Sequence, residues 1–392
     1  MSHKLKILWS SNAPFATSGY AQQTAEITPL IQQEGYEIAL LDFFGLTGGK
    51  VLLNGMVNYP VINHTYGSDG LVLHGKDFGA DVTMTLQDTW VLNPQDLQQT
   101  TRWIPWTPID HDPITPPVLQ NLRLAYRIIS MSEFGQKELA RNGLMSTFIP
   151  HSVNTDIFTP MNTIERKQQT GLPADCYLVG MVAANKDNPP RKSFQEVLDA
   201  FKMFLEKVPQ AILYIHSNPD FPGGFNFRQY ADYIGIGPDK LLTPDMYQMN
   251  YNIGKEQMAK IYNTMDVLLM PSISEGFGIT AIEAQSCSVP VIVNNFTSMP
   301  EMVVPGETGW VCDLIKGPSG KRFSPQGSYM GIPDTLSLFE KMMDAYRADR
   351  GKVKKACRKW ILDKYSTEKI FKTKWIPFLE TLENEVYPTN TK

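Results

Sequence analysis

Two carboxylates and a glycine loop lie close together in the second half of the chain. Glu275 begins the tetrapeptide Glu-Gly-Phe-Gly, which ends at Gly278, and Glu283 follows eight positions after the first Glu. At the start of a helix such a loop leaves backbone N–H groups free, and these donors and the helix dipole favour a phosphate or a sugar hydroxyl. Glycines also let a ligand come close to the backbone. The spacing therefore predicts a binding loop for a phosphorylated or hydroxylated ligand.

The elements predicted around this loop are those of a nucleotide-binding α/β sheet. An apolar run over residues 267–270, preceded by Asp266, has the length of a strand and stops at Pro271. After Gly278 an apolar-periodic segment predicts a helix. Because Glu275 lies in the loop and Glu283 about one turn into the helix, we expect both carboxylates to face one cleft. A helix N-cap followed by a surface Glu is the alternative interpretation.

Two cations, Arg191 and Lys192, lie directly before a helix predicted from Ser193. Their loop follows a predicted strand over residues 177–182, so it lies at the carboxyl edge of a parallel sheet, where ligands bind. Lys186 lies earlier in the same loop. Cations at this position can hold a phosphate, and a solvated run of charge is the alternative.

Polar and aromatic residues also follow two strands of the first half. Asp88 and Trp90 come after an apolar run that ends at Leu86, and carbohydrate sites combine an aromatic platform with carboxylates. A Trp at this position packs in a core at least as often. After the next run come Asp110 and His111. This His could be a metal ligand, a general base, a positioned donor or a capped structural residue, and no second His lies at metal-ligand spacing.

Composition limits the classes of protein. The 392 residues are 19% charged and 42% hydrophobic with a net charge of −4, which is typical of a folded protein and gives no broad field for nucleic acid. The charge therefore disfavours a nucleic-acid partner, and nucleic acid stays only as an alternative. The four cysteines are far apart, which fits a reducing compartment. Without a run of ~18 apolar residues, we expect a cytoplasmic protein with no integral membrane segment.

Together with the following Ala-Gln-Ser-Cys-Ser-Val-Pro-Val-Ile, the Glu-Gly-Phe-Gly motif resembles the signature of the retaining nucleotide-sugar glycosyltransferases of family four. This resemblance implies that Glu275 and the backbone amides after it hold the transferred sugar, and that Glu283 holds the nucleotide ribose. It also implies that Arg191 and Lys192 bind the diphosphate. Met181 stands where the family carries another phosphate-binding Arg, and that role then passes to Lys186.

Further site residues follow from the same resemblance. The implied catalytic residues are Glu275, His111, Lys192 and Arg191, with His111 contacting the transferred sugar or the acceptor. Implied donor contacts are Gly19, Lys186, Gly276, Phe277, Gly278, Ile279, Glu283 and Thr243. The acceptor candidates are Asp88, Trp90 and Asp110. No metal ligand and no cofactor are expected, and a UDP- or GDP-linked sugar would be the co-substrate.

The fold that the resemblance implies is GT-B, an α/β architecture of two Rossmann-like doubly wound domains facing a central cleft. The predicted domains are an acceptor domain over residues 1–165, a nucleotide-sugar donor domain over 166–365, and a C-terminal helix over 366–392 that returns to the first domain. Three local expectations accompany this fold. Residues 45–65 should be a loop or hairpin, Pro29 should kink or shorten its helix, and residues 317–333 should be an inserted surface loop.

The predicted function is a metal-independent retaining transfer of a sugar to an acceptor hydroxyl. A nucleotide-sugar epimerase of similar two-domain fold is an alternative, as is a glycosyltransferase that acts on a modified nucleic-acid base. A non-catalytic subunit that binds sugar nucleotides would bind the donor without turnover, and the presence of Glu275, Glu283 and Lys192 argues against it.

Overall fold

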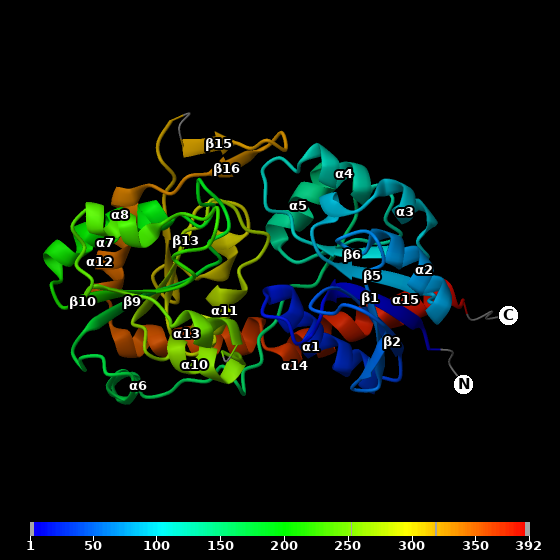
Figure 1. Ribbon diagram of the computed structural model, residues 1–392, viewed down its shortest axis with the longest axis horizontal. Helices are drawn as coiled ribbons and strands as arrows, with labels where there is room; N and C mark the ends of the chain where they lie inside the picture. Colours follow the sequence, from blue (N-terminus) through cyan, green and yellow to red (C-terminus); the bar gives the residue numbers. More distant parts are fainter. Residues whose placement is uncertain (1–3, 252, 318–319, 389–392) are drawn as a thin grey trace. The chain divides into compact units, whose positions relative to one another are not determined.

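The computed structural model describes residues 4–251, 253–317 and 320–388. The chain forms two compact units. Unit 1 consists of Met1–Ser152, Gln326–Ser328 and Thr367–Lys392, and unit 2 consists of Val153–Pro325 and Tyr329–Ser366. Each unit contains a largely parallel sheet with helices on both of its faces (Figure 1). This is the α/β class expected from the alternating apolar runs.

The eight-stranded sheet of unit 1 has the order β3-β4-β2-β1-β5-β6-β7-β8. Its strands are β1 (Lys6–Asn12), β2 (Glu37–Phe44), β3 (Val51–Leu53), β4 (Met56–Pro60), β5 (Val82–Leu86), β6 (Trp103–Thr107), β7 (Ile129–Ser130) and β8 (Thr147–Phe148). All neighbours pair in parallel except β3 with β4. Because β2 and β5 flank β1 on opposite sides, the strand order reverses at β1. Ligands bind at the carboxyl ends of strands beside such a switch point.

The helices of unit 1 connect these strands. They are α1 (Gly19–Gln33), α2 (Ser68–Phe78), α3 (Pro94–Gln99), α4 (Pro116–Leu122) and α5 (Glu133–Arg141), with a 3₁₀ turn η1 at Thr89–Val91. The C-terminal segment belongs to the same unit and comprises α14 (Thr367–Ile370), a π-helical turn (Phe371–Trp375) and α15 (Ile376–Val386). Trp375 packs into the core, with its ring centroid 5.8 Å from that of Trp9 and 5.0 Å from that of Trp106.

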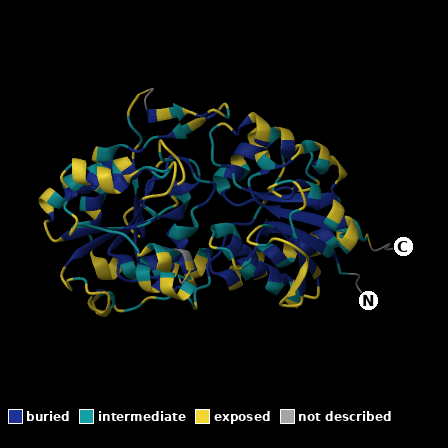
Figure 2. Ribbon diagram, in the orientation of Figure 1, coloured by how far each residue is buried: buried dark blue, intermediate teal, exposed yellow. Residues whose placement is uncertain are grey.

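The six-stranded sheet of unit 2 is parallel throughout and has the order β11-β10-β9-β12-β13-β14. Its strands are β9 (Tyr177–Val182), β10 (Ala211–His216), β11 (Leu241–Leu242), β12 (Val267–Met270), β13 (Val291–Asn294) and β14 (Gly309–Cys312). Its helices are α6 (Thr163–Gln169), α7 (Phe194–Lys207), α8 (Phe227–Tyr233), α9 (Met246–Tyr251), α10 (Lys255–Tyr262), α11 (Ile279–Ser286), α12 (Thr335–Arg347) and α13 (Arg350–Lys364), with a 3₁₀ turn η2 at Met299–Met302. Figure 2 shows the central strands of both sheets as buried and the outer helix faces as exposed.

Unit 2 begins at Val153, whereas the sequence pattern placed the domain boundary after residue 165. Its first residues are held by helix α13. The backbone N–H of Val153 donates to the carbonyl oxygen of Tyr365 at 3.0 Å. Arg358 donates to the carbonyl oxygens of Thr155 and Phe158 at 2.9 and 2.8 Å. This segment therefore belongs to unit 2 because it contacts residues about two hundred positions later in the sequence. No local sequence pattern predicts such contacts.

The three local expectations have different outcomes. Residues 45–65 contain the β3–β4 hairpin, as one alternative predicted, and β4 also extends the main sheet by pairing with β2. Shortening of the first helix was wrong, because α1 continues through Pro29 to Gln33. The inserted surface loop predicted over 317–333 contains regular structure. Strands β15 (Lys321–Phe323) and β16 (Tyr329–Gly331) form an antiparallel pair there, and residues 318–319 lie outside the described residues.

Candidate functional site

The predicted strand, loop and helix around Glu275 are present in unit 2. Strand β12 lies beside β9 in the parallel sheet, so the loops that follow both strands lie at the same edge. One loop carries Glu275 and the other carries Arg191 and Lys192. The Lys192 ammonium forms an ion pair with Glu275 Oε1, and Arg191 Nη1 lies 3.5 Å from Glu275 Oε2. Residues 83 positions apart in the sequence thus form one charged cluster.

The charge state of this cluster is decided by its cations. Burial alone would raise the pKa of Glu275, but Lys192 and Arg191 hold it at about 2. Burial and the neighbouring Arg191 lower the pKa of Lys192, which Glu275 opposes. Both side chains are mostly shielded, with 15% of Glu275 and 18% of Lys192 exposed. Glu275 is therefore an ionised hydrogen-bond acceptor at neutral pH.

Backbone contacts hold the Glu-Gly-Phe-Gly loop in place. Ser298 Oγ donates to the carbonyl oxygens of Glu275 and Phe277 at 2.8 and 3.1 Å. Thr297 Oγ1 donates to the carbonyl oxygen of Glu275 at 2.9 Å. Arg191 also donates to the carbonyl oxygen of Ser274 at 2.5 Å. Sequence reasoning missed Thr297 and Ser298, although two hydroxyl residues shortly after β13 lie at the same edge of a parallel sheet as this loop.

Gly278 gives the loop its turn into helix α11. Its φ is +123°, a backbone conformation that favours glycine, and a Cβ there would lie 2.8 Å from Met270 Cε. As the N-cap of α11, it supplies no side-chain acceptor for the first N–H groups of the helix. Those groups and the positive end of the helix dipole therefore suit an anionic or hydroxylated ligand.

Glu283 lies in α11 and is 96% shielded from solvent, since only 4% of it is exposed. Its Oε2 accepts a hydrogen bond from Tyr262 Oη at 2.7 Å. Burial, followed by the charge of Glu283, raises the pKa of Tyr262 well above its usual value, so Tyr262 is a stable donor. The sequence did not indicate this partner, because Tyr262 belongs to the preceding helix α10.

The other predicted donor contacts of unit 2 have varied surroundings. Gly276 and Phe277 are buried, and the Phe277 ring packs edge-on against Tyr365 with centroids 5.8 Å apart, so only the backbone of Phe277 suits a ligand. Ile279 is half-buried at the start of α11. Lys186 is exposed.

Two polar groups follow neighbouring strands of the same sheet. Thr243 comes just after β11, where its hydroxyl accepts from Arg228. His216 ends β10 and contacts Tyr214 Oη at 2.8 Å through Nδ1. Burial lowers its pKa to about 4, so this His is neutral at pH 7.

The candidates of unit 1 follow strands β1, β5 and β6. His111 Nδ1 lies 2.7 Å from Asp110 Oδ1 after β6, and this contact orients the imidazole. Asp88 follows β5 and precedes η1, which contains Trp90. Trp90 is 47% exposed, so the core-packing alternative was wrong for this residue. Gly19 is the first residue of α1, and the preceding Ser18 caps that helix by accepting from the Ala21 N–H at 3.1 Å.

A buried carboxylate in unit 1 was also missed. Asp42 is 1% exposed at the end of β2, and neither of its oxygens has a hydrogen-bond partner among the described residues. Burial raises its pKa to about 7. Gln87, at the end of β5, is equally buried and its amide also has no partner in the described chain. A signal was available in the sequence, since Asp42 directly follows the apolar residues 38–41 and Gln87 directly follows the strand that ends at Leu86.

The described residues contain neither a cluster of metal ligands nor a helix that could span a membrane. No group of three or more His, Cys, Asp or Glu side chains there is arranged to hold a metal ion. Within the same ranges, no helix has the length and apolar character that crossing a bilayer requires.

Comparisons with known proteins cover different parts of the chain. Residues 163–314 match the family model of glycosyl transferases group 1. Among curated proteins, the D-inositol 3-phosphate glycosyltransferase of Mycolicibacterium smegmatis is 29% identical over 164 residues, which is 41% of this chain and 35% of that protein. The chain thus spans less than half the length of the curated relatives it matches.

Solved structures resemble nearly the whole chain in fold. Sucrose-phosphate synthase from Thermosynechococcus elongatus has a TM-score of 0.76 at 17% identity, covering 97% of this chain and 99% of that one. Anabaena Alr3699/HepE in complex with UDP and glucose has a TM-score of 0.68 at 16% identity, covering 97% and 100%.

Proposed function

We propose that this protein is a retaining glycosyltransferase, because residues 163–314 match the family model of glycosyl transferases group 1 and the chain has the GT-B fold. It moves a sugar from a nucleoside diphosphate sugar to an acceptor hydroxyl without a metal ion. The observation that carries this proposal is the cluster of Glu275, Lys192 and Arg191 beside the N-terminus of α11.

The chemistry of the transfer requires what this cluster supplies. As the diphosphate leaves, negative charge grows on its oxygens and positive charge grows on the sugar. Lys192 and Arg191 offer fixed positive charge to the phosphates, and the uncapped N–H groups of α11 add to it. When the donor binds, the Lys192 ammonium donates hydrogen bonds to both Glu275 and the diphosphate. Glu275 then accepts hydrogen bonds from sugar hydroxyls and favours the positive charge that develops on the ring.

Retention of configuration is supported by the same cluster. A carboxylate with a pKa of about 2 is a poor general base, so Glu275 is unsuited to deprotonating the acceptor. A leaving phosphate oxygen on the same face of the sugar is the better base. Attack from that face, with the proton passing to the departing diphosphate, retains the configuration.

The donor and the acceptor are proposed at the level of chemical class. A UDP-linked hexose is the first donor to test, because the Anabaena neighbour is in complex with UDP and glucose, and GDP-linked sugars follow. The acceptor is a hydroxylated compound, as in the curated relatives that act on D-inositol 3-phosphate. We assign its recognition to Asp88, Trp90, Asp110 and His111, with Trp90 as an exposed platform for a sugar-like ring.

A donor panel tests this function. Full-length protein is incubated with UDP- and GDP-linked sugars, alone and with candidate polyol acceptors, and release of nucleoside diphosphate is measured. We expect one donor class to be turned over, and Lys192→Ala to reduce that turnover by ~100-fold or more. Lys207→Ala is the matched control, since it removes an exposed lysine from the far end of α7. Full activity in Lys192→Ala, or a changed sugar nucleotide released without transfer, would contradict the proposal.

A further inference from the structure

Helix α13 carries a concentration of positive charge that the proposed transfer does not use. Lys354, Lys355, Arg358 and Lys359 recur with spacings of one and four residues, so their side chains lie along one face of the helix. The chain as a whole has a net charge of −4, so this face is opposite in sign to the molecule. A cluster of positive charge on one helix face favours the binding of an anionic ligand.

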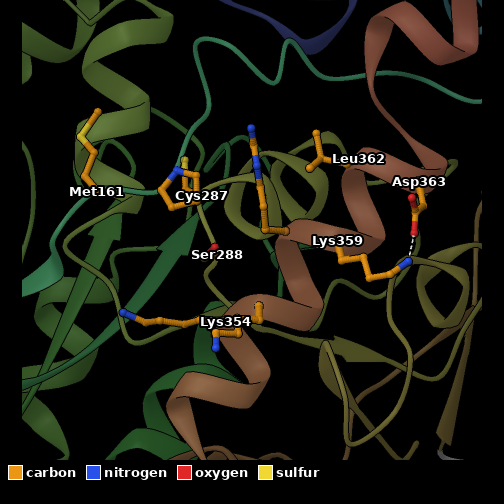
Figure 3. A pocket seen from close by; sticks show the side chains of 10 residues that line it. Met161, Cys287, Ser288, Lys354, Lys359, Leu362 and Asp363 are labelled. Carbon is orange, nitrogen blue, oxygen red and sulfur yellow. Dashed lines mark hydrogen bonds and ion pairs between the residues drawn. The ribbon is translucent and has the colours of Figure 1, made fainter.

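These side chains line a cavity of about 530 Å³ within unit 2. The rest of its lining comes from Pro160, Met161, Cys287 and Ser288, together with Leu362 and one carboxylate, Asp363, of α13. Leu362 is 43% exposed. Figure 3 shows Leu362, Lys359 and Asp363 on α13, with Met161, Cys287 and Ser288 on the other side of the view. The volume lies within the range of small-molecule sites, about 300–1,000 Å³.

Arg358 builds the wall of this cavity and is not free for a ligand. Its guanidinium donates to the carbonyl oxygens of Phe158 and Ser286, at 2.8 and 3.0 Å, and to Ser286 Oγ at 2.9 Å. Because Ser286 is the last residue of α11, Arg358 neutralises the negative end of that helix. An anion can therefore approach the C-terminal end of α11, whose partial negative charge would otherwise repel it.

The three lysines are available to an anion. Lys355 is exposed and has no ion pair or hydrogen bond to the described residues. Lys359 pairs with Asp363, but 78% and 55% of these side chains are exposed, and such surface pairs are readily exchanged. The Lys354 ammonium donates to Thr163 Oγ1 at 2.8 Å. Burial lowers the pKa of Lys354, so an anionic partner would be favourable there.

We propose that this cavity binds a phosphate ester, with the phosphate held by Lys354, Lys355 and Lys359. Cations that line one cavity suit a dianionic group, and lysine binds phosphate as a point charge. The apolar wall of Pro160, Met161 and Leu362 contacts the organic part of the ligand. The site lies at the C-terminal end of α11, whereas the Glu275 loop precedes its N-terminal end, and the two share no residue. This binding is separate from the proposed sugar transfer.

Two probes distinguish the sources of such an ester. Calorimetry with full-length protein measures binding of glycerol 3-phosphate as the soluble form. Co-sedimentation with phosphatidylcholine vesicles, with and without phosphatidic acid, measures the lipid form. The test variant is Lys355→Ala with Lys359→Ala. Its matched control is Lys137→Ala with Lys352→Ala, which removes two exposed lysines that do not line the cavity. Lys192→Ala reports any binding at the donor site.

We expect wild type, the control pair and Lys192→Ala to bind at least one probe, and the test variant to bind it at least about tenfold more weakly. Binding of glycerol 3-phosphate would identify a soluble ligand, binding only to phosphatidic acid vesicles would identify a lipid headgroup, and either supports the proposal. Absence of binding to both probes would overturn it. Equal weakening in the two double variants, or a loss confined to Lys192→Ala, would overturn it as well.

Discussion

Glu275 has two cations at its carboxylate before any substrate arrives. Its pKa of about 2 means that the acid is ionised throughout the range in which the protein would be assayed. With a folded pKa below the usual value of 4.5, this group stabilises the fold above about pH 4.5, and the contribution is lost as the pH falls towards 2. The residue therefore acts as a permanent negative charge in the proposed reaction.

Replacement of this charge should reduce the rate of transfer. In Glu275→Gln the side chain keeps its size but no longer favours positive charge on the sugar ring, an interaction that is strongest in the transition state. We expect kcat to fall by ~100-fold with a small change in KM for the donor. Steady-state kinetics with the donor identified by the panel measures both constants. An unchanged kcat with a raised KM would assign Glu275 to ground-state binding.

The second carboxylate should give the opposite pattern. Glu283 is proposed to bind the ribose equally in the substrate complex and in the transition state, so Glu283→Gln should raise KM by about tenfold and leave kcat nearly unchanged. Tyr262→Phe removes the hydroxyl that donates to Glu283 and serves as a companion variant. If it also raises KM, positioning of the carboxylate matters. A large loss of kcat in Glu283→Gln would reverse the roles of the two acids.

At the scale of the element, the strand, loop and helix from β12 to α11 act as one support for the site. The loop is short and its carbonyl groups are held by Thr297 and Ser298, so the amides before α11 keep one arrangement. Preorganised donors of this kind do not need to reorganise during the reaction.

A glycine variant tests this rigidity. Gly278→Ala would place a Cβ at a φ of +123°, where backbone strain should displace the loop. The Met270 methyl group, 2.8 Å from that Cβ, is the end of a flexible side chain and can shift aside. We expect the free energy of unfolding to fall by ~1–3 kcal/mol and the KM for donor to rise. Gly306→Ala is the control, because its φ is +78° but nothing lies within 4 Å of the added Cβ.

Thermal melts and donor kinetics of both variants separate a general loss of stability from a change in the loop. We expect Gly306→Ala to lose less stability, because a φ of +78° is closer to the left-handed region that other residues adopt, and to retain its kinetics. Unchanged donor kinetics in Gly278→Ala would show that the loop tolerates the displacement and that its geometry is not part of the site.

At the scale of the whole molecule, the distribution of charge matters more than its total. The net charge is −4, yet Arg191 and Lys192 place positive charge beside the Glu275 loop, and α13 places more in the cavity described above. A local field of fixed cations can take the part that a metal ion has in other phosphate-transferring sites.

Metal independence follows as a prediction about the intact protein. Turnover of the donor should be the same, within about twofold, in excess chelator and in added magnesium or manganese, because Lys192 and Arg191 supply the charge that stabilises the leaving group. The measurement is the initial rate after dialysis against chelator, with each metal added back. Loss of activity in chelator and its return with one of the metals would show that an ion is required.

Much of the fold was predictable from local patterns. The apolar run before Pro271 and the glycines after it predicted β12, its loop and α11, because strand length, helical periodicity and the conformational freedom of glycine depend on neighbours in the sequence. The alternation of strands and helices likewise predicted two α/β halves. Shortening of α1 at Pro29 was wrong, and the segment over 317–333 contains a strand pair that local patterns did not predict, because tertiary packing overrides local preference.

The partners of the site residues were decided only by the tertiary structure. Residue types and order led to Glu275, Lys192 and Glu283, but they did not show that Lys192 pairs with Glu275 or that Tyr262 donates to Glu283. The cavity beside α13 likewise joins segments near residues 160, 287 and 358. Burial, side-chain pairing and pKa depend on which distant segments the fold brings together. The amino-acid sequence alone does not give the spatial distances between those segments.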